Sequence, residues 1–180
     1  MGRFNNDGTS SAGDHDALDD CDICTAGKYQ TSTGQTSCTS CLAGRYISDN
    51  ANDETKHDAV GDCTYCSSPN YQSATGANNC NTACQKGQKL DSSSGATSCT
   101  TCPSGTYQDT AGETTCDVCP SGKYNDATGS TNTNFDNVAD CTSCLAGRYI
   151  SDTTTASLHD EVGDCTYCSS PNYQSATGAN

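Results

Sequence analysis

The chain has very few of the residues that build a conventional hydrophobic core. Leu, Ile, Val and Phe together make up 14 of its 180 residues, and it contains one Met and no Trp. A fraction so far below about 20% would ordinarily leave a charged chain disordered. No apolar run is long enough to cross a bilayer, so we predict no membrane span. Apolar burial therefore cannot be what holds a fold together here.

Basic residues are scarce as well. Eight Lys and Arg stand against 22 Asp and Glu, which gives a net charge of −14. Such a chain repels phosphate backbones, so we expect no nucleic-acid partner. The simplest interpretation of the acidic residues is a solvated surface. Weak calcium binding is a second interpretation, although the spacing of the densest cluster fits no EF-hand: Asp14, Asp16, Asp19, Asp20 and Asp22.

Catalytic side chains are almost missing. The three histidines, His15, His57 and His159, occupy one recurring slot, and Phe135 fills that slot in a fourth copy. A residue that alternates with Phe is expected to pack a loop rather than to move protons. Ser and Thr are abundant, but no base accompanies them in a repeated arrangement. We predict no catalytic site and no enzyme.

What the chain does have is cysteine, 16 in all, arranged as eight close pairs. This fraction is typical of disulfide scaffolds, in which covalent links replace a core. A reducing cytosol would open such links, so we expect an extracellular or cell-surface location, or another oxidising compartment. Seven pairs read CxxC and the eighth has one more residue: Cys21/Cys24, Cys38/Cys41, Cys63/Cys66, Cys99/Cys102, Cys116/Cys119, Cys141/Cys144, Cys165/Cys168 and Cys80/Cys84.

Zinc competes for the same cysteines, because repeated CxxC pairs could supply sites of four thiolates. Three observations argue against it. The glycine that follows six of the eight pairs stands three residues after the second cysteine, not directly after it. The Gly-x-Tyr phrase that recurs around that glycine has no role in metal ligation, and the chain lacks the basic residues of a nucleic-acid-binding zinc array. We therefore predict neither zinc nor any other cofactor.

A short phrase recurs between the pairs, with a Gly three residues after the cysteine and a Tyr two residues later, as in Cys24-Thr-Ala-Gly27-Lys-Tyr29. We expect the Gly to adopt a positive φ or to allow a close backbone approach. The Tyr ring should lie over a neighbouring disulfide and serve as the nearest equivalent of a core. The structural aromatics are Tyr29, Tyr46, Tyr71, Tyr107, Tyr124, Tyr149 and Tyr173.

The predicted fold is a set of small disulfide-rich repeats, an elongated rod of short β-hairpins and loops with almost no helix and no conventional hydrophobic core. We interpret residues 1–180 as one continuous array and a fragment of a longer one, because both ends stop within a repeat. Residues 38–49 recur unchanged as 141–152, which indicates duplication. The approximate units are 1–21, 22–38, 39–63, 64–80, 81–99, 100–116, 117–141, 142–165 and 166–180.

The pattern CxxCxxGxYxxxxGxxxC, present from Cys99 to Cys116, resembles the ephrin-receptor-like cysteine-rich repeat and, more loosely, the tumour necrosis factor receptor repeat. The resemblance covers nearly the whole chain and is specific for architecture rather than function. Two departures are the CxxxC at Cys80/Cys84 and the Ser-Ser-Pro-Asn-Tyr segments that end at Tyr71 and Tyr173, where the Gly is lost.

Spacing alone leaves the disulfide connectivity open. A rival scheme pairs first cysteine with first and second with second, starting Cys21 to Cys38, and leaves none free. We favour a ladder, which is similar to tumour necrosis factor receptor modules and leaves open the two cysteines, Cys21 and Cys168, whose partners the interrupted end repeats place outside the sequence. Its bonds join Cys24 to Cys38, Cys41 to Cys63, Cys66 to Cys80, Cys84 to Cys99, Cys102 to Cys116, Cys119 to Cys141 and Cys144 to Cys165.

Two classes of function fit these observations. The first is an extracellular structural protein, a stalk, surface fibre or appendage filament, whose partners are copies of itself or neighbouring repeats. The second is a ligand-binding receptor ectodomain or secreted signalling module, which the resemblance allows but the near-identical copies argue against. No Asn-x-Ser/Thr sequon is present, and O-linked glycans on the Ser- and Thr-rich loops are a further hypothesis.

Overall fold

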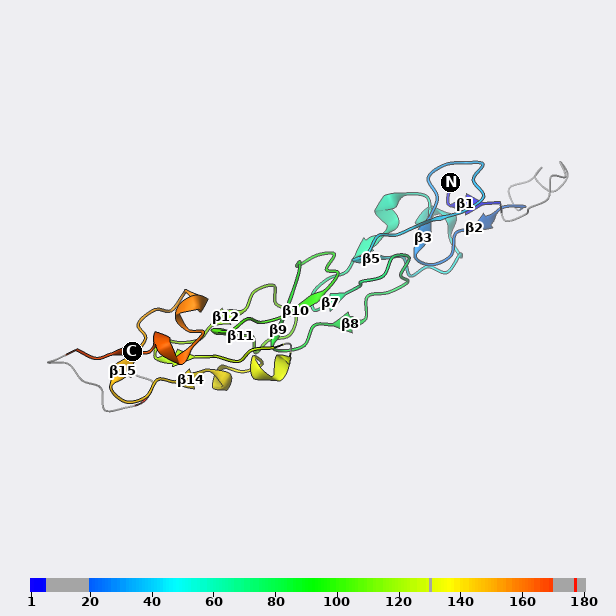
Figure 1. The fold of residues 1–180 in the computed structure, drawn as a ribbon. Helices are drawn as coiled ribbons and strands as arrows, with labels where there is room; N and C mark the ends of the chain where they lie inside the picture. Colours follow the sequence, from blue (N-terminus) through cyan, green and yellow to red (C-terminus); the bar gives the residue numbers. More distant parts are fainter. Residues whose placement is uncertain (6–19, 130, 170–176, 178–180) are drawn as a thin grey trace. The chain divides into compact units, whose positions relative to one another are not determined.

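A computed structural model describes residues 1–5, 20–129, 131–169 and 177. The chain forms two compact units. The first contains Met1–Thr82 and Ser92–Ser98, and the second contains Ala83–Asp91 and Cys99–Asn180. Both units are built from the same element, a hairpin of two very short strands followed by a loop (Figure 1). The nine smaller repeat units inferred from the sequence stay a prediction.

Every named strand is two or three residues long, as expected where β character is confined to the residues around each Tyr. Successive strands pair as two-stranded sheets. The pairs are β1 (Arg3–Phe4) with β2 (Asp22–Ile23), β3 (Lys28–Tyr29) with β4 (Thr39–Ser40), β5 (Arg45–Tyr46) with β6 (Thr64–Tyr65), β7 (Asn70–Tyr71) with β8 (Thr82–Ala83), β9 (Gln88–Leu90) with β10 (Cys99–Thr101), β11 (Thr106–Tyr107) with β12 (Asp117–Val118), β13 (Lys123–Tyr124) with β14 (Thr142–Ser143), and β15 (Arg148–Tyr149) with β16 (Thr166–Tyr167).

Three long loops, residues 41–63, 119–141 and 144–165, are each closed by a disulfide and contain two 3-10 turns of three residues. In each second turn the aspartate that precedes the cysteine accepts a hydrogen bond from a backbone amide three residues earlier, for example the Asp62 carboxylate from Ala59 at 2.8 Å. These aspartates therefore cap turns. The turns are η3 (Glu54–Lys56), η4 (Val60–Asp62), η5 (Asn132–Asn134), η6 (Val138–Asp140), η7 (Ala156–Leu158) and η8 (Val162–Asp164).

Most of the buried hydrophobic side chains are cysteines, and Cys24, Cys41, Cys84, Cys119 and Cys144 are fully buried. Within the described residues there is no α-helix, and none of their helical turns is long and apolar enough to cross a membrane. The predicted fold class is confirmed in its main features, because disulfides and short hairpins take the place of an apolar core.

The glycine of each phrase connects one repeat to the next. The Gly27 N–H donates to the carbonyl of Ile47 at 3.0 Å, and the Gly27 carbonyl accepts from the N–H of Cys41 at 2.8 Å. Gly27 has φ +76°, and a Cβ placed there would lie 2.1 Å from the carbonyl oxygen of Gly76. Both expectations for this glycine, a positive φ and a close backbone approach, are confirmed. We call this pair of hydrogen bonds the glycine bracket.

The bracket recurs in both units with the same geometry. Gly44 in the first unit and Gly105 in the second each donate at 2.8 Å to the residue that follows the next repeat's aromatic strand, Gln72 and Asn125 respectively. Their carbonyls accept from the cysteine amides of Cys66 and Cys119. The repeats are therefore joined by backbone hydrogen bonds that need no particular side chain, only the absence of one.

Candidate functional site

The structure contains seven disulfides, each joining the second cysteine of one pair to the first cysteine of the next. Their Cα–Cα distances of 5.6–5.9 Å are ordinary for disulfides. Cys21 and Cys168 are half-buried and unbonded. The bonds are Cys24–Cys38, Cys41–Cys63, Cys66–Cys80, Cys84–Cys99, Cys102–Cys116, Cys119–Cys141 and Cys144–Cys165.

The tyrosines of the repeated phrase are half-buried on their strands. Tyr29 packs against Cys41 and Cys63, which form the next disulfide along the chain, and against Ile47. Tyr124 packs in the same way on the cluster that contains Cys144 and Cys165. Half-burial is also found for Tyr46, Tyr71, Tyr107 and Tyr149, whereas Tyr173 lies outside the described residues.

Tyr107 also has altered acidity. Its burial, together with the nearby carboxylates of Asp117 and Asp109, raises the pKa of its hydroxyl above the ordinary value of 10.0. All these influences disfavour the phenolate. Tyr107 is thus a neutral structural ring at any physiological pH, as expected for a residue that substitutes for a core.

Two of the long loops, residues 41–63 and 144–165, are centred on a fully buried histidine and are called the histidine loops below. His57 Nδ1 lies 2.7 Å from the carbonyl oxygen of Lys28, and Nε2 lies 3.2 Å from Oδ2 of Asp49. His159 Nδ1 lies 2.7 Å from the carbonyl oxygen of Lys123. Its Nε2 lies 3.1 Å from the carbonyl oxygen of Asp152 and 3.5 Å from Oδ1 of the same residue. Each ring therefore links its loop to the preceding hairpin.

The third long loop, residues 119–141, contains Phe135 in this slot and is called the phenylalanine loop. Its ring is 1% exposed. The carbonyl of Phe135 accepts from the N–H of Gln108 at 2.7 Å, and the carbonyl of His57 accepts from the N–H of Gln30 at 2.8 Å. The backbone contact is the same in both loops. In both, the side chain in the slot is a flat buried ring. His15 lies outside the described residues.

The carboxylates beside the histidines are held ionised. Burial raises the pKa of Asp49, but hydrogen bonds from the amides of Asn52 and Asp53, the contact with His57 and the charge of Lys56 outweigh it, and the pKa lies below 3.8. Both histidine loops thus place an anionic side chain against a buried ring.

Asp152 is held in a similar way in the second histidine loop. Hydrogen bonds from the amides of Thr155 and Thr154 lower the pKa of Asp152 against the opposing effect of burial. The Thr155 hydroxyl and the nearby His159 add to this lowering. The anion is therefore fixed mainly by the turn that follows it, and the histidine meets a carboxylate that is already positioned.

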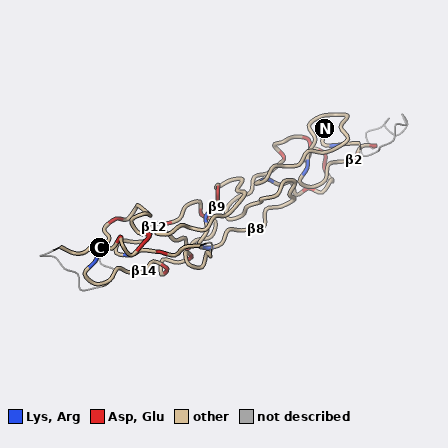
Figure 2. The backbone as a smooth tube through the Cα atoms, viewed as in Figure 1, with Lys and Arg blue, Asp and Glu red and all other residues tan. Residues whose placement is uncertain are grey.

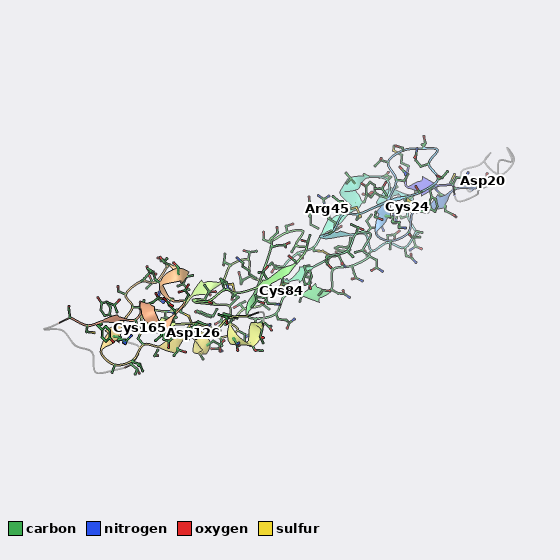
Figure 3. The ribbon with its side chains drawn as sticks, in the orientation of Figure 1. Asp20, Cys24, Arg45, Cys84, Asp126 and Cys165 are labelled. Carbon is green, nitrogen blue, oxygen red and sulfur yellow. A yellow bond between two sulfur atoms is a disulfide. The ribbon has the colours of Figure 1, made fainter. Side chains whose placement is uncertain are left out.

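Each unit also has an exposed surface in which an arginine lies over a tyrosine. Arg45 lies on β5 (Figure 3). Its guanidinium lies 3.9 Å from the centre of the Tyr65 ring, and that of Arg148 lies 4.2 Å from the centre of the Tyr167 ring. Leu42 and Leu145, three residues before these arginines, are 68% and 64% exposed. We call the two sets the arginine–tyrosine surfaces: Leu42, Arg45 and Tyr65, and Leu145, Arg148 and Tyr167.

The phenylalanine loop has a different set of residues at these positions, namely Pro120, Lys123 and Ser143. Lys and Arg are thinly distributed among the acidic residues (Figure 2). Within the described residues, Arg45 and Arg148 each contact a tyrosine hydroxyl and no carboxylate.

Metal ligands do not gather in the described part of the chain, where no group of three or more His, Cys, Asp or Glu is placed to hold an ion. The fourteen bonded cysteines present no thiolate to zinc. Asp14, Asp16 and Asp19 of the acidic cluster lie outside the described residues. Near the end of each long loop, one carboxylate oxygen of the aspartate accepts a hydrogen bond from a turn amide; these aspartates are Asp62, Asp140 and Asp164.

The sequence matches the model of a family described as tyrosine-protein kinase ephrin type A/B receptor-like, over residues 8–56 and 87–135, more than half of the chain. The chain belongs to this family. A search of the curated proteins found no match. The ephrin-receptor-like family is a receptor-like cysteine-rich repeat and not an enzyme family, and it indicates an extracellular, oxidising location. The looser likeness to the tumour necrosis factor receptor repeat is compatible with the bonds described above.

Sequence reasoning found the histidine slot but missed its partner. The signal was present, because Asp49 stands eight residues before His57 and Asp152 seven before His159, whereas Ala127 stands eight before Phe135. At this position, three residues after the strand tyrosine, an aspartate stands where the ring is histidine, and Ala127 stands where the ring is phenylalanine, with Asp126 one residue earlier. That joint change, read along the repeats of one chain, would have predicted the contact.

Proposed function

We propose that this ephrin-receptor-like chain is part of an extracellular structural protein, a stalk, surface fibre or appendage filament built from many such repeats. The observation that supports this most directly is the glycine bracket, which connects repeat to repeat through backbone groups in both units. Such a connection extends an array without a specialised module. The unchanged copy of residues 38–49 at 141–152 agrees with growth by duplication.

The partners in this proposal are further copies of the chain or neighbouring repeats, in contact through the arginine–tyrosine surfaces. Each surface combines an exposed leucine with a cation that has no carboxylate partner among the described residues. The chain itself has a net charge of −14, so acidic segments of another copy are the available complement. The surface occurs twice, once in each unit, which is what a repeating contact requires.

Imaging of the native material, or of the oxidised chain at high concentration, tests the function. Regular fibres are the expected result. Discrete monomers that capture a soluble ligand would instead support the second candidate, a receptor ectodomain or signalling module. The family match is the observation that favours that candidate, because the family is named for a receptor.

Paired variants test the contact surface. Leu42→Ser with Leu145→Ser, and Arg45→Glu with Arg148→Glu, should each weaken self-association, which analytical ultracentrifugation would measure as a change in sedimentation. Pro120→Ser, at the matching position of the phenylalanine loop, is the control and should have no effect. Equal sedimentation of all variants would show that other residues make the contact, while fibres by imaging would still support the function.

O-linked glycans on the exposed Ser and Thr residues would add bulk to such a fibre without changing its fold. Intact-mass measurement of the natural protein is the test, and masses above that of the oxidised polypeptide, in steps of sugar residues, are expected. A mass equal to that of the bare polypeptide less its disulfide hydrogens would remove the glycans from the proposal.

A further inference from the structure

The two buried histidines share a hydrogen-bonding arrangement that a neutral imidazole cannot satisfy. Both ring nitrogens of His57 face acceptors, the Lys28 carbonyl on one side and the Asp49 carboxylate on the other. A neutral ring donates from one nitrogen only, and only the doubly protonated ring donates from both. The His57 side chain is fully buried, so solvent water cannot supply the hydrogen bond that a neutral ring would lack.

His159 repeats the arrangement in the second unit. Its Nδ1 faces the Lys123 carbonyl, and its Nε2 faces the carbonyl and the carboxylate of Asp152. All three partners are acceptors once the carboxylate is ionised. The arrangement is therefore a recurrent feature of the histidine loops and does not depend on one local conformation.

The carboxylate and the histidine also occur together in the sequence. Asp7 precedes His15 by eight residues, as Asp49 precedes His57. In the phenylalanine loop both members are replaced, by Ala127 and Phe135. Although Asp126 stands one residue before Ala127, the position of the partner itself is an aspartate only where the ring can carry charge, which supports a role for it with the charged form of the ring.

The other charged groups around each histidine pair elsewhere or lie at the surface. Beside His57, the Lys56 ammonium lies 3.8 Å from both Asp49 and Asp53, and Glu54 pairs with Arg3. Beside His159, the amides of Asp160 and Glu161 donate to Asp164. Among the described residues, Asp49 and Asp152 are thus the carboxylates in contact with the rings. The remaining titratable neighbours are Lys28, Tyr29 and Asp58 for the first ring, and Lys123 and Tyr124 for the second.

Water reaches the carboxylate but not the ring. Asp49 lines an open cavity of about 510 Å³ together with Ser48, Asp62 and Thr64. Asp152 lines the equivalent cavity of about 340 Å³ in the second unit. A proton can therefore pass between solvent and the buried ring through the aspartate, without unfolding of the loop.

We propose that the histidine loops are pH-sensitive clasps, closed while each buried ring carries both protons and loosened when one is lost. Loss of the second proton leaves the lone pair of Nε2 directed at an anionic oxygen in a buried site. We therefore expect the histidine loops to be most stable in mild acid and to loosen as the pH rises through the histidine range, because a neutral ring leaves one of its two acceptors without a donor. The phenylalanine loop has no such response.

Hydrogen exchange on the intact oxidised chain tests this proposal, with amide protection corrected for the intrinsic effect of pH. Between pH 5.5 and pH 8 we expect residues 41–63 and 144–165 to lose about tenfold more protection than residues 119–141. The phenylalanine loop is an internal control in the same sample. Parallel changes in all three loops would overturn the proposal.

Two variants separate the clasp from a merely structural role. His57→Phe with Asp49→Ala copies the phenylalanine loop, and should abolish the pH response of residues 41–63 while that of 144–165 persists. Asp49→Asn keeps the shape, and its amide can donate to a neutral ring, so the loop should stay closed at pH 8. Nitrogen NMR on labelled histidine should show both ring nitrogens protonated at pH 5.5, and a singly protonated ring at that pH would refute the proposal even if a variant failed to fold.

Discussion

The histidine loop at residues 41–63 and the phenylalanine loop at 119–141 solve the same packing problem with different chemistry. Each is closed by a disulfide between cysteines 22 residues apart, and each contains two 3-10 turns. His57 and Phe135 are both buried, and their carbonyls accept the same backbone hydrogen bond. The difference lies in the ring, which is hydrogen-bonded at both nitrogens in one loop and apolar in the other.

The comparison teaches that the fold requires a flat ring at this slot but does not require a polar one. Disulfide, turns and backbone contacts are shared, so they account for the shape of the loop. Phe135 fills the slot without a partner, whereas His57 needs Asp49 and the Lys28 carbonyl. The histidine therefore adds two side-chain hydrogen bonds that the shape of the loop does not require.

Truncation of Phe135 to alanine would open a cavity whatever the chemistry of the ring. Phe135→His is the sharper change, because it keeps a ring in the slot and alters its polarity. We expect it to destabilise the phenylalanine loop by about 3–5 kcal/mol, because an apolar ring is lost and a polar ring is buried opposite Ala127, which offers no carboxylate. Adding Ala127→Asp should recover about 1–2 kcal/mol at pH 5.5 and less at pH 8. Urea unfolding followed by exchange of the loop amides measures both. A double variant no more stable than the single one would show that the aspartate is not the ring's partner.

Removal of one disulfide from each loop sharpens the comparison in the opposite way. Cys41→Ser with Cys63→Ser and Cys119→Ser with Cys141→Ser should each cost about 3 kcal/mol, because both bonds close loops of equal length. At pH 5.5 the two losses should agree. At pH 8 the histidine loop should open further, and non-reducing peptide maps would verify which bond is missing. Unequal losses at pH 5.5 would mean that the loops differ in more than their rings.

Much of the fold could be predicted because its determinants are local in sequence. Gly27 stands at a fixed distance from a cysteine, and both its positive φ and its close approach follow from the absence of a side chain. Tyr29 was expected over a disulfide and packs on Cys41 and Cys63. Family and hairpin architecture follow from the same spacing. These features repeat, so each copy reinforces the inference from the others.

The charge state of the loops could not be predicted in the same way. His57 was interpreted as a packing residue, and it is buried, but its two hydrogen bonds come from segments 29 and 8 residues away. The contact with Lys28 depends on how the loop folds back on the hairpin, whereas the contact with Asp49 is indicated in the sequence only by the joint occurrence of the two residues along the repeats. The two equivalent cavities beside Asp49 and Asp152 likewise depend on how the loops pack in the tertiary structure, and they could not be predicted from residue spacing.

Glycine substitutions probe what the two kinds of loop have in common. A Cβ at Gly87 would lie 2.1 Å from the carbonyl oxygen of Asn132, which begins the first turn of the phenylalanine loop. A Cβ at Gly105 would lie 2.1 Å from that of Ala156, at the same point of a histidine loop. Gly87→Ala and Gly105→Ala should therefore each cost about 2–3 kcal/mol at any pH. Gly34→Ala is the control, since Gly34 has φ +71° but open space around its Cβ, and about 1 kcal/mol is expected. Equal losses of stability for all three variants would show that the positive φ, and not the close backbone approach, accounts for the need for glycine.

The smallest expected difference between the loops appears in strong acid. Because the pKa of Asp49 and that of Asp152 are lowered in the folded chain, each carboxylate contributes stability above its unfolded value near 3.8, and that stability is lost as the pH falls through the folded pKa. Between pH 4 and pH 2 the histidine loops should therefore lose protection that the phenylalanine loop, with Ala127 in place of the aspartate, retains. Hydrogen exchange at these pH values measures it, and Asp49→Asn should reduce the acid response of residues 41–63 and leave that of 144–165 unchanged, while Asp53, whose pKa is lowered by hydrogen bonds from Thr55, accounts for what remains. Since Asp49 accepts from turn amides as well as from the histidine, persistence of the acid response in His57→Phe would assign it to the turn, and its disappearance would assign it to the ring.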